Sequence, residues 1–190
     1  MPLLVLASSS PRRLALLAQL GVVPARVAHP EVDEAPLPAE PPRDYVRRIA
    51  RTKAEAAARG GDEVILAADT TIAVGRRILG KPADEAELRA MLRLLSGRRH
   101  RCLSAVAMID ATGRLRERLS DTIVAFKPLS AAEIDSYVVS GEGMGKAGGY
   151  AIQGRAEAFV KYLAGSHSGV VGLPLYETRA LLAACGIALG

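Results

Sequence analysis

Two arginines stand at the start of a predicted helix, where electrostatics disfavours cations. An apolar run, Leu3 to Ala7, ends in Ser8-Ser9-Ser10-Pro11, and a helical pattern with Arg12 and Arg13 in its first turn follows. The free N–H groups and the dipole at a helix N-terminus attract anions. A polyphosphate between the two side chains would explain the pattern, since the guanidinium fork matches phosphate oxygens. Two solvated arginines that bend away from the helix end would explain it equally well.

A lysine on an apolar helix stripe is the next candidate. Lys53 lies four residues after Ile49 and seven after Val46, in a helix expected over Arg43 to Arg59. Its ammonium could donate to phosphate inside a cleft, or it could extend to solvent. The spacing alone favours a Lys53 side chain that extends its ammonium to solvent.

A carboxylate follows a strongly apolar run. Val64 to Ala68 shows no alternation, which predicts a strand buried on both faces, with Asp69 at its end. Ligands of α/β sheets commonly bind where such strands end. Asp69 could hold Mg²⁺ or orient an attacking water there, or it could cap a turn through the N–H groups of Thr70 or Thr71.

Further carboxylates lie in a proline-rich segment. Residues Pro30 to Pro42 hold five prolines and four carboxylates, which predicts a surface loop. One of Glu31, Asp33 and Glu34 could complete a site with Asp69, and the others would be ordinary solvated charges.

Two apparent nucleotide motifs fail on their context. Gly75 to Pro82 spells most of a P-loop, but Pro82 replaces the magnesium-binding Ser/Thr and offers no N–H to phosphate. Lys81, between Gly80 and Pro82, could still be functional. Gly143 to Gly148 matches G-x-G-x-x-G, yet a predicted helix precedes it and a strand follows, the reverse of the Rossmann order. Its glycines indicate a loop whose backbone approaches another group closely.

The remaining elements alternate between helices and strands. We expect a helix after Ser10 that ends before Gly21, a hairpin over Thr71 to Leu79 that turns near Gly75, and a helix over Asp84 to Leu95. Paired strands should follow over Arg101 to Ile109 and Leu115 to Phe126. We then expect a helix opened by a capping box of Ser130 and Glu133, a strand near Ala158 to Leu163, and a last helix after Pro174.

Composition restricts the class of protein. The chain has 190 residues, 49% of them hydrophobic, and we expect a single domain over residues 1–190. Aromatic residues make up only 4%, which argues against base-stacking surfaces of the RNA-binding kind. The net charge of +5 suits phosphate-bearing partners, whether free nucleotides or polynucleotides.

The cysteine pattern and the hydropathy restrict it further. Cys102 and Cys185 are far apart and form no C-x-x-C, which argues against a disulfide scaffold or a structural zinc site. No apolar run approaches the roughly 20 residues that cross a bilayer, so we expect a cytoplasmic protein without a membrane partner.

Five blocks of sequence, in order along nearly the whole chain, resemble the signatures of the Maf nucleotide pyrophosphatases. They are Leu6-Ala-Ser-Ser-Ser-Pro-Arg-Arg13, Ala68-Asp69-Thr70 with Gly80-Lys81-Pro82, Leu95-Ser96-Gly97 with His100, Lys146-Ala-Gly-Gly-Tyr-Ala-Ile-Gln-Gly154, and Gly169-Val-Val-Gly-Leu-Pro-Leu-Tyr-Glu177.

The resemblance implies an α/β fold with a mixed twisted sheet in two lobes about a central cleft, similar to inosine triphosphate pyrophosphatases. It implies hydrolysis of nucleoside triphosphates between the α and β phosphates with a divalent cation (Mg²⁺, Mn²⁺ or Co²⁺). By position, Asp69 resembles the proton acceptor, and Glu34 joins it as a metal ligand, with Asp33 as the alternative register. The substrate-binding positions are Ser8, Arg12, Arg13, Lys53, Thr70, Lys81 and Gln153.

The resemblance extends to the base. Arg12, Thr70 and Gln153 match the dTTP/UTP branch of the family, and a glutamine amide can pair with the imide edge of a pyrimidine. The chain departs from the family at Gly145, where many members carry an acid, and at Ser104-Ala105, where Thr-Gly is usual.

Functions without hydrolysis remain open from the sequence. The basic charge would suit a nucleotide- or nucleic-acid-binding regulator of cell division. Nucleic acid is disfavoured because no predicted helix has the Lys/Arg density of a DNA reader. Asp69 separates hydrolysis from binding, since binding alone does not require that carboxylate. The oligomeric state, monomer or homodimer, stays open.

Overall fold

A single mixed sheet organises the molecule. The computed structural model describes residues 2–57 and 60–189. Its strands are β1 (Leu3–Ala7), β2 (Arg26–Ala28), β3 (Glu63–Val74), β4 (Arg77–Leu79), β5 (Arg99–Ile109), β6 (Leu115–Phe126) and β7 (Val160–Ala164). They lie in the order β2-β1-β3-β5-β6-β7, with β4 paired to β3 off this path. Strand β1 runs parallel to β2 and β3, and the other pairs are antiparallel. The expected α/β fold with a mixed sheet is confirmed.

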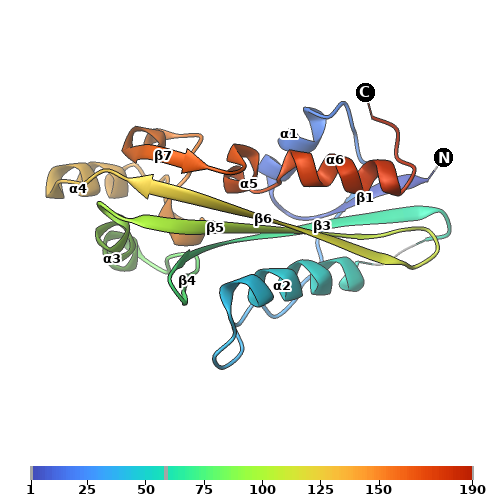
Figure 1. Ribbon diagram of the computed structural model, residues 1–190, viewed down its shortest axis with the longest axis horizontal. Helices are drawn as coiled ribbons and strands as arrows, with labels where there is room; N and C mark the ends of the chain where they lie inside the picture. Colours follow the sequence, from blue (N-terminus) through green and yellow to red (C-terminus); the bar gives the residue numbers. More distant parts are fainter. Residues whose placement is uncertain (1, 58–59, 190) are drawn as a thin grey trace.

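Helices cover both faces of the sheet. They are α1 (Pro11–Ala18), α2 (Pro42–Ala56), α3 (Glu85–Leu95), α4 (Ala131–Val139), α5 (His167–Val171) and α6 (Leu175–Ala184), with short 3₁₀ turns η1 (Ala147–Gly149) and η2 (Arg155–Phe159). Figure 1 shows α2 on one face, α1, α5 and α6 on the other, and α3 and α4 at one end of the long strands. No helix among the described residues has both the length and the apolar character needed to cross a bilayer.

Strand β3 supplies both sides of the core. Val64 and Leu66 pack with α1 and α6, whereas Ile65 and Ala67 pack beneath α2. Successive strand residues point to opposite faces. Both faces are covered here, so every position from Val64 to Ala68 is apolar, and this explains the run without alternation.

A further core fills the end of the sheet near α3 and α4. Leu88 and Leu92 of α3, Ile134 and Tyr137 of α4, and Phe126 of β6 belong to it. The buried residues of α3 recur at helical spacing on one face: Leu88, Met91, Leu92 and Leu95. These side chains form one lobe, and the layers beneath α1, α2 and α6 form the other.

The prediction that Asp69 lies at a strand end is wrong. Strand β3 continues through it to Val74, because β5 pairs with β3 on both sides of this position. Strand β1, by contrast, pairs with β3 only as far as Ala7 opposite Ala67. Asp69 therefore lies just beyond the point where β1 leaves β3.

The ends of two predicted elements need correction. The strand expected near Ala158 to Leu163 is β7, which runs from Val160 to Ala164 because residues 155–159 form the 3₁₀ turn η2. Helix α2 ends at Ala56, and Ala57 takes an extended backbone. Residues 58–59 of the predicted helix lie outside the described part of the chain. Two short elements, β2 and α5, were not predicted, since three and five residues give too little periodicity to detect.

The capping predictions mostly hold. Asp84 accepts from the Glu87 N–H at the start of α3, and Ser130 with Glu133 forms the expected capping box of α4. Ser10 has the extended backbone of an N-cap, but its side chain makes no capping hydrogen bond. The hairpin, the paired strands β5 and β6 and the last helix are confirmed.

Candidate active site

The residues singled out from the sequence meet in one cavity of about 880 Å³. Strand β1, the start of α1, helix α2, strand β3, the loop around residues 29–36 and the glycine-rich loop all contribute to its wall. The lining includes Ser8, Arg12, Arg13, Glu34, Lys53, Asp69, Thr70, Lys81 and Gln153. The cavity begins where β1 leaves β3, because that departure uncovers the flank of β3 at Asp69.

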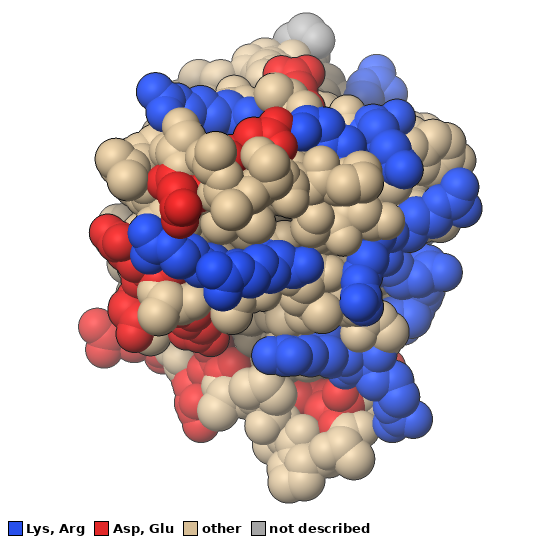
Figure 2. Space-filling view, turned by 90° about the vertical axis from the view of Figure 1, so that its left-hand side faces the viewer, with Lys and Arg blue, Asp and Glu red and all other residues tan. Residues whose placement is uncertain are grey.

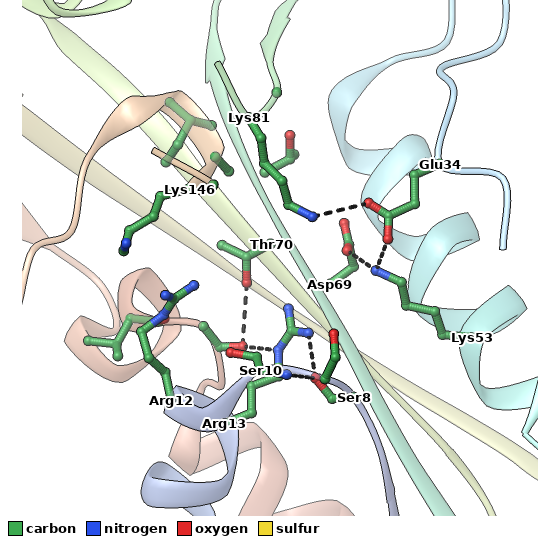
Figure 3. Close-up of a pocket in the computed structure, with 18 of the residues that line it drawn as sticks. Ser8, Ser10, Arg12, Arg13, Glu34, Lys53, Asp69, Thr70, Lys81 and Lys146 are labelled. Carbon is green, nitrogen blue, oxygen red and sulfur yellow. Dashed lines mark hydrogen bonds and ion pairs between the residues drawn. The ribbon is translucent and has the colours of Figure 1, made fainter. Parts of the chain in front are cut away.

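Lys53 links two carboxylates across the cavity. Its Nζ lies 2.7 Å from Asp69 Oδ1 and 2.7 Å from Glu34 Oε1. The Lys53 side chain is only 12% exposed, so it points into the cleft rather than to solvent. Lys81 approaches from the opposite wall, with its Nζ 3.8 Å from Glu34 Oε2 (Figure 3).

The two carboxylates are held in different electrostatic states. Burial raises the pKa of Asp69 and outweighs the opposing effects of Lys53 and Arg13. Burial acts in the same direction on Glu34, but the hydrogen bond and charge of Lys53, with Lys81 and Arg13, hold the pKa of Glu34 below its ordinary value. A raised pKa favours proton acceptance at Asp69, whereas a lowered pKa favours the charged form of Glu34.

Both arginines turn inward and are anchored on α5. Arg13 Nε donates to Gly172 O at 2.9 Å, and Arg12 Nε donates to Val171 O at 3.3 Å. Arg13 Nη1 also donates to Ser8 Oγ at 3.0 Å. Their remaining N–H groups face the cavity beside the open start of α1, a suitable place for phosphate oxygens.

Ser8 organises the turn between β1 and α1. Its hydroxyl accepts from the Ser10 backbone N–H at 3.2 Å and from Arg13. Ser8 is buried at the end of β1. The sequence position of Ser8 was enough to predict that it lines the site. Its hydrogen bond to Arg13 becomes evident only in the folded structure.

The loop acids separate in the structure. Glu34 enters the cavity and Glu31 lines its wall. Asp33 Oδ1 accepts from the Ala35 backbone N–H at 2.8 Å, as a turn residue does. Tyr45 of α2 helps to hold Glu34, since its hydroxyl donates to Glu34 O at 3.0 Å. Sequence reasoning missed Tyr45.

Lys146 is a second residue that sequence reasoning assigned no role. It lines the cavity from the glycine-rich loop and lies on the same side as Arg12 in Figure 3. Burial and the nearby charge of Arg12 lower the pKa of Lys146. An anion beside both cations would relieve their repulsion.

Thr70 and Gln153, the two residues expected to recognise the base, differ in their hydrogen bonds to the protein. Thr70 Oγ1 lies 2.8 Å from Ser104 Oγ and 3.4 Å from Gly172 O. Gln153 is exposed at the cavity wall, and none of the described residues forms a hydrogen bond with its amide.

The carboxylates fit a divalent cation that arrives with phosphate. No group of three or more His, Cys, Asp or Glu side chains in the described residues could hold a metal ion alone. Mg²⁺ is commonly bound by one or two carboxylates, with substrate phosphates and water as its other ligands. Asp69 and Glu34 each have a second carboxylate oxygen beyond the one that faces Lys53.

Together the fold and the site define an α/β protein whose cleft is lined by cations suited to phosphate and contains a buried carboxylate with a raised pKa. The chain belongs to the Maf family: the model for Maf-like protein matches residues 3–185.

Relatives match the chain over nearly its full length. A dTTP/UTP pyrophosphatase of Sphingopyxis alaskensis is 70% identical over 190 residues, which is 100% of both chains. A dTTP/UTP pyrophosphatase of Novosphingobium aromaticivorans is 60% identical and covers 98% of this chain and 93% of its own. Among solved structures, the Ham1 protein of Staphylococcus aureus is 14% identical with a TM-score of 0.45, covering 65% of this chain and 71% of its own.

Proposed function

We propose that this protein hydrolyses dTTP and UTP to the nucleoside monophosphate and pyrophosphate with the help of a divalent cation. Asp69 carries the proposal, since hydrolysis needs a proton acceptor, which binding alone does not, and burial raises the pKa of this carboxyl inside the cavity. The names of the full-length relatives supply the substrates.

The proposed reaction is direct attack of water on the α-phosphorus. The water oxygen forms a bond to phosphorus while the α–β bridging P–O bond breaks, and its electron pair leaves with pyrophosphate. Asp69 orients the water and accepts its proton. Arg12, Arg13, Lys53 and Lys81 bind phosphate oxygens and stabilise the charge that develops on the leaving pyrophosphate.

Glu34 and Asp69 would hold the cation, which we propose to be Mg²⁺, Mn²⁺ or Co²⁺. A bound divalent cation neutralises phosphate charge and polarises the phosphorus–oxygen bonds. Lys53 bridges the same two carboxylates. It therefore keeps them close together when no cation lies between them.

Base recognition is assigned to Thr70 and Gln153. Both line the cavity, whose volume of about 880 Å³ lies within the usual range for small-molecule sites. The Gln153 amide offers one donor and one acceptor group to the imide edge of uracil or thymine.

A nucleic-acid-binding role finds less support. On the face shown in Figure 2, acidic side chains gather along one side and basic ones spread over the rest. A DNA-binding face is normally more uniformly basic.

The test is product analysis with a panel of nucleotides. Purified protein with Mg²⁺ or Mn²⁺ should convert UTP and dTTP to monophosphate and pyrophosphate, at least about 10-fold faster in kcat/KM than ATP or GTP. Chelation of the metal with EDTA should abolish turnover. Release of orthophosphate with a nucleoside diphosphate would place cleavage at the γ-phosphate and refute the proposal.

A further inference from the structure

Thr70 lines the cavity, and the proton of its hydroxyl is committed to the protein. Thr70 of β3 and Ser104 of β5 are cross-strand partners, and their hydroxyl oxygens lie 2.8 Å apart. Ser104 Oγ lies 2.6 Å from Gly169 O. A carbonyl oxygen can only accept, so the Ser104 hydroxyl donates its single proton to Gly169.

This order fixes the direction of the next hydrogen bond. Ser104 has no second proton, so the hydroxyl of Thr70 must be the donor between the two side chains. The other protein neighbour of Thr70 Oγ1, Gly172 O at 3.4 Å, is also an acceptor. Both contacts draw the Thr70 proton into the protein. Thr70 therefore presents lone pairs, and no proton, to a ligand in the cavity.

Burial makes it costly to reverse the donor and acceptor roles of Ser104 and Thr70. Ser104 is 1% exposed, so no solvent can replace its partners. If Ser104 turned its proton toward Thr70, two oxygens 2.6 Å apart would face each other without a proton between them. A buried acceptor left unpaired in this way is strongly unfavourable.

The exposed amide at Gln153 has no such fixed polarity. None of the described residues bonds to it, so the amide can turn over and exchange its donor and acceptor positions. It can then pair with uracil, whose N3 carries hydrogen, or with cytosine, whose N3 is an acceptor. Discrimination between these two bases requires a group with one fixed polarity.

We infer that Ser104 is a positioning residue: it fixes the Thr70 hydroxyl as an acceptor, and Thr70 thereby selects uracil and thymine over cytosine through the N3–H of the base. This inference rests on the proposed function, since it assumes a pyrimidine triphosphate in the cavity. Cytosine would place its N3, an acceptor, against the Thr70 hydroxyl oxygen, which is also an acceptor. Phosphate oxygens, which are also acceptors, are equally unsuited to this position.

The test compares UTP with CTP in wild-type protein and in Ser104→Ala. Wild-type protein should prefer UTP by at least about 10-fold in kcat/KM. Ser104→Ala leaves Thr70 only the weak contact to Gly172, so its hydroxyl can rotate and donate to cytosine. The UTP/CTP ratio should fall by about 10-fold. Loosening of α5 would disturb the arginines equally for both substrates and cancels in the ratio.

Two further variants separate positioning from general damage. Ser104→Thr keeps the hydroxyl and should keep the ratio. Thr70→Ala removes the reader and should lower the ratio as far as Ser104→Ala does. The double variant should then show no additional change, since Ser104 acts through Thr70. Thr70→Ala, at a half-buried position, supplies the test even where Ser104→Ala does not fold.

Three results are decisive against the inference. An unchanged UTP/CTP ratio in Ser104→Ala and Thr70→Ala, with both kcat/KM values lowered together, would show a structural role alone. A change confined to the UTP/dUTP ratio would mean that Thr70 accepts from the ribose instead. Wild-type protein that prefers CTP would overturn the assigned polarity. Failure of wild-type protein to hydrolyse any pyrimidine triphosphate would instead refute the proposed function, before any variant is compared.

Discussion

Two carboxylates of the cleft share one ammonium and yet differ in their pKa shifts. Lys53 contacts Asp69 and Glu34 at the same distance, 2.7 Å, yet the pKa of Asp69 is raised and that of Glu34 is lowered. The difference comes from burial, because the Asp69 side chain is 10% exposed and that of Glu34 is 40% exposed. Burial thus raises the proton affinity of a carboxylate that is paired with a cation.

Replacement of Asp69 tests its role as proton acceptor. Asp69→Asn keeps the shape and removes the basic oxygen, so kcat should fall at least about 10²-fold. Because burial raises the folded-state pKa of Asp69, its charge costs stability above that pKa and not below the unfolded value. The neutral amide removes this cost, and Tm at neutral pH should not fall. Activity assays and thermal unfolding measure both effects.

Asp121→Asn is the matched control. Asp121 is also a strand aspartate bound to cations, Arg43 and Arg101, but it lies outside the cavity wall. Its replacement should leave kcat unchanged. If Asp121→Asn lost as much turnover as Asp69→Asn, the effect at Asp69 would come from a change in the overall charge and not from a specific role in proton transfer.

Sequence periodicity identified which side chains lie in the site better than it predicted their exposure and their partners. The stripe of α2 placed Lys53 on the buried face, but spacing favoured an exposed ammonium. The two carboxylates that hold Lys53 inside come from distant segments of the chain. Proximity of this kind depends on the tertiary fold, which local patterns do not encode.

At the scale of elements, the glycine-rich loop is shaped by close packing. A side chain carbon at Gly148 would lie 2.7 Å from Ile72 Cγ1, and one at Gly149 would lie 2.5 Å from Leu88 Cδ1. The expectation that this loop approaches something closely is confirmed, and the neighbours are β3 and α3 of the protein itself. The loop carries Lys146 to the cavity.

A pair of alanine substitutions separates backbone strain from packing. Gly145 and Gly148 both have positive φ, +70° and +68°, but nothing lies within 4 Å of a carbon added at Gly145. Gly145→Ala should cost about 1–2 kcal/mol of unfolding free energy from backbone strain alone. Gly148→Ala should cost about 1–3 kcal/mol more, because Ile72 must move. Urea denaturation measures both, and equal losses would show that the packing is not tight.

The sequence predicted most of the elements and missed β2 and α5. Apolar spacing and capping residues were sufficient for α3 and α4, and the apolar run predicted the first half of β3 but not its end. Helix α5 has five residues, and its start is fixed by the hydrogen bond from the Gly169 N–H to Ser166 Oγ. This helix ends at the carbonyls that hold Arg12 and Arg13. The inward turn of the arginines was therefore beyond prediction from the sequence.

At the scale of the molecule, three long strands join the two lobes. Strand β3 contributes Ile72 to the core near α3 and Leu66 to the core near α1, and β5 contributes Cys102 and Val106 in the same way (Figure 1). The predicted single domain over residues 1–190 remains a proposal. The shared strands support it, since neither lobe keeps a complete sheet without the other.

This continuity predicts one cooperative unfolding transition. Leu92→Ala in the core near α3 and Leu17→Ala in the core near α1 remove fully buried side chains. Each should lower the stability of the same transition by about 2–5 kcal/mol. Calorimetric and van't Hoff enthalpies should agree in both variants. An early separate transition in Leu92→Ala would show that the lobes unfold as independent domains.

The central claim is that water, oriented by Asp69, attacks the α-phosphorus. Hydrolysis of UTP in ¹⁸O-labelled water, followed by mass spectrometry of both products, tests it most directly. The account predicts one labelled oxygen in UMP and none in pyrophosphate. Label in pyrophosphate would mean attack at the β-phosphorus, and labelled orthophosphate with UDP would mean attack at the γ-phosphorus. Either result would contradict the account.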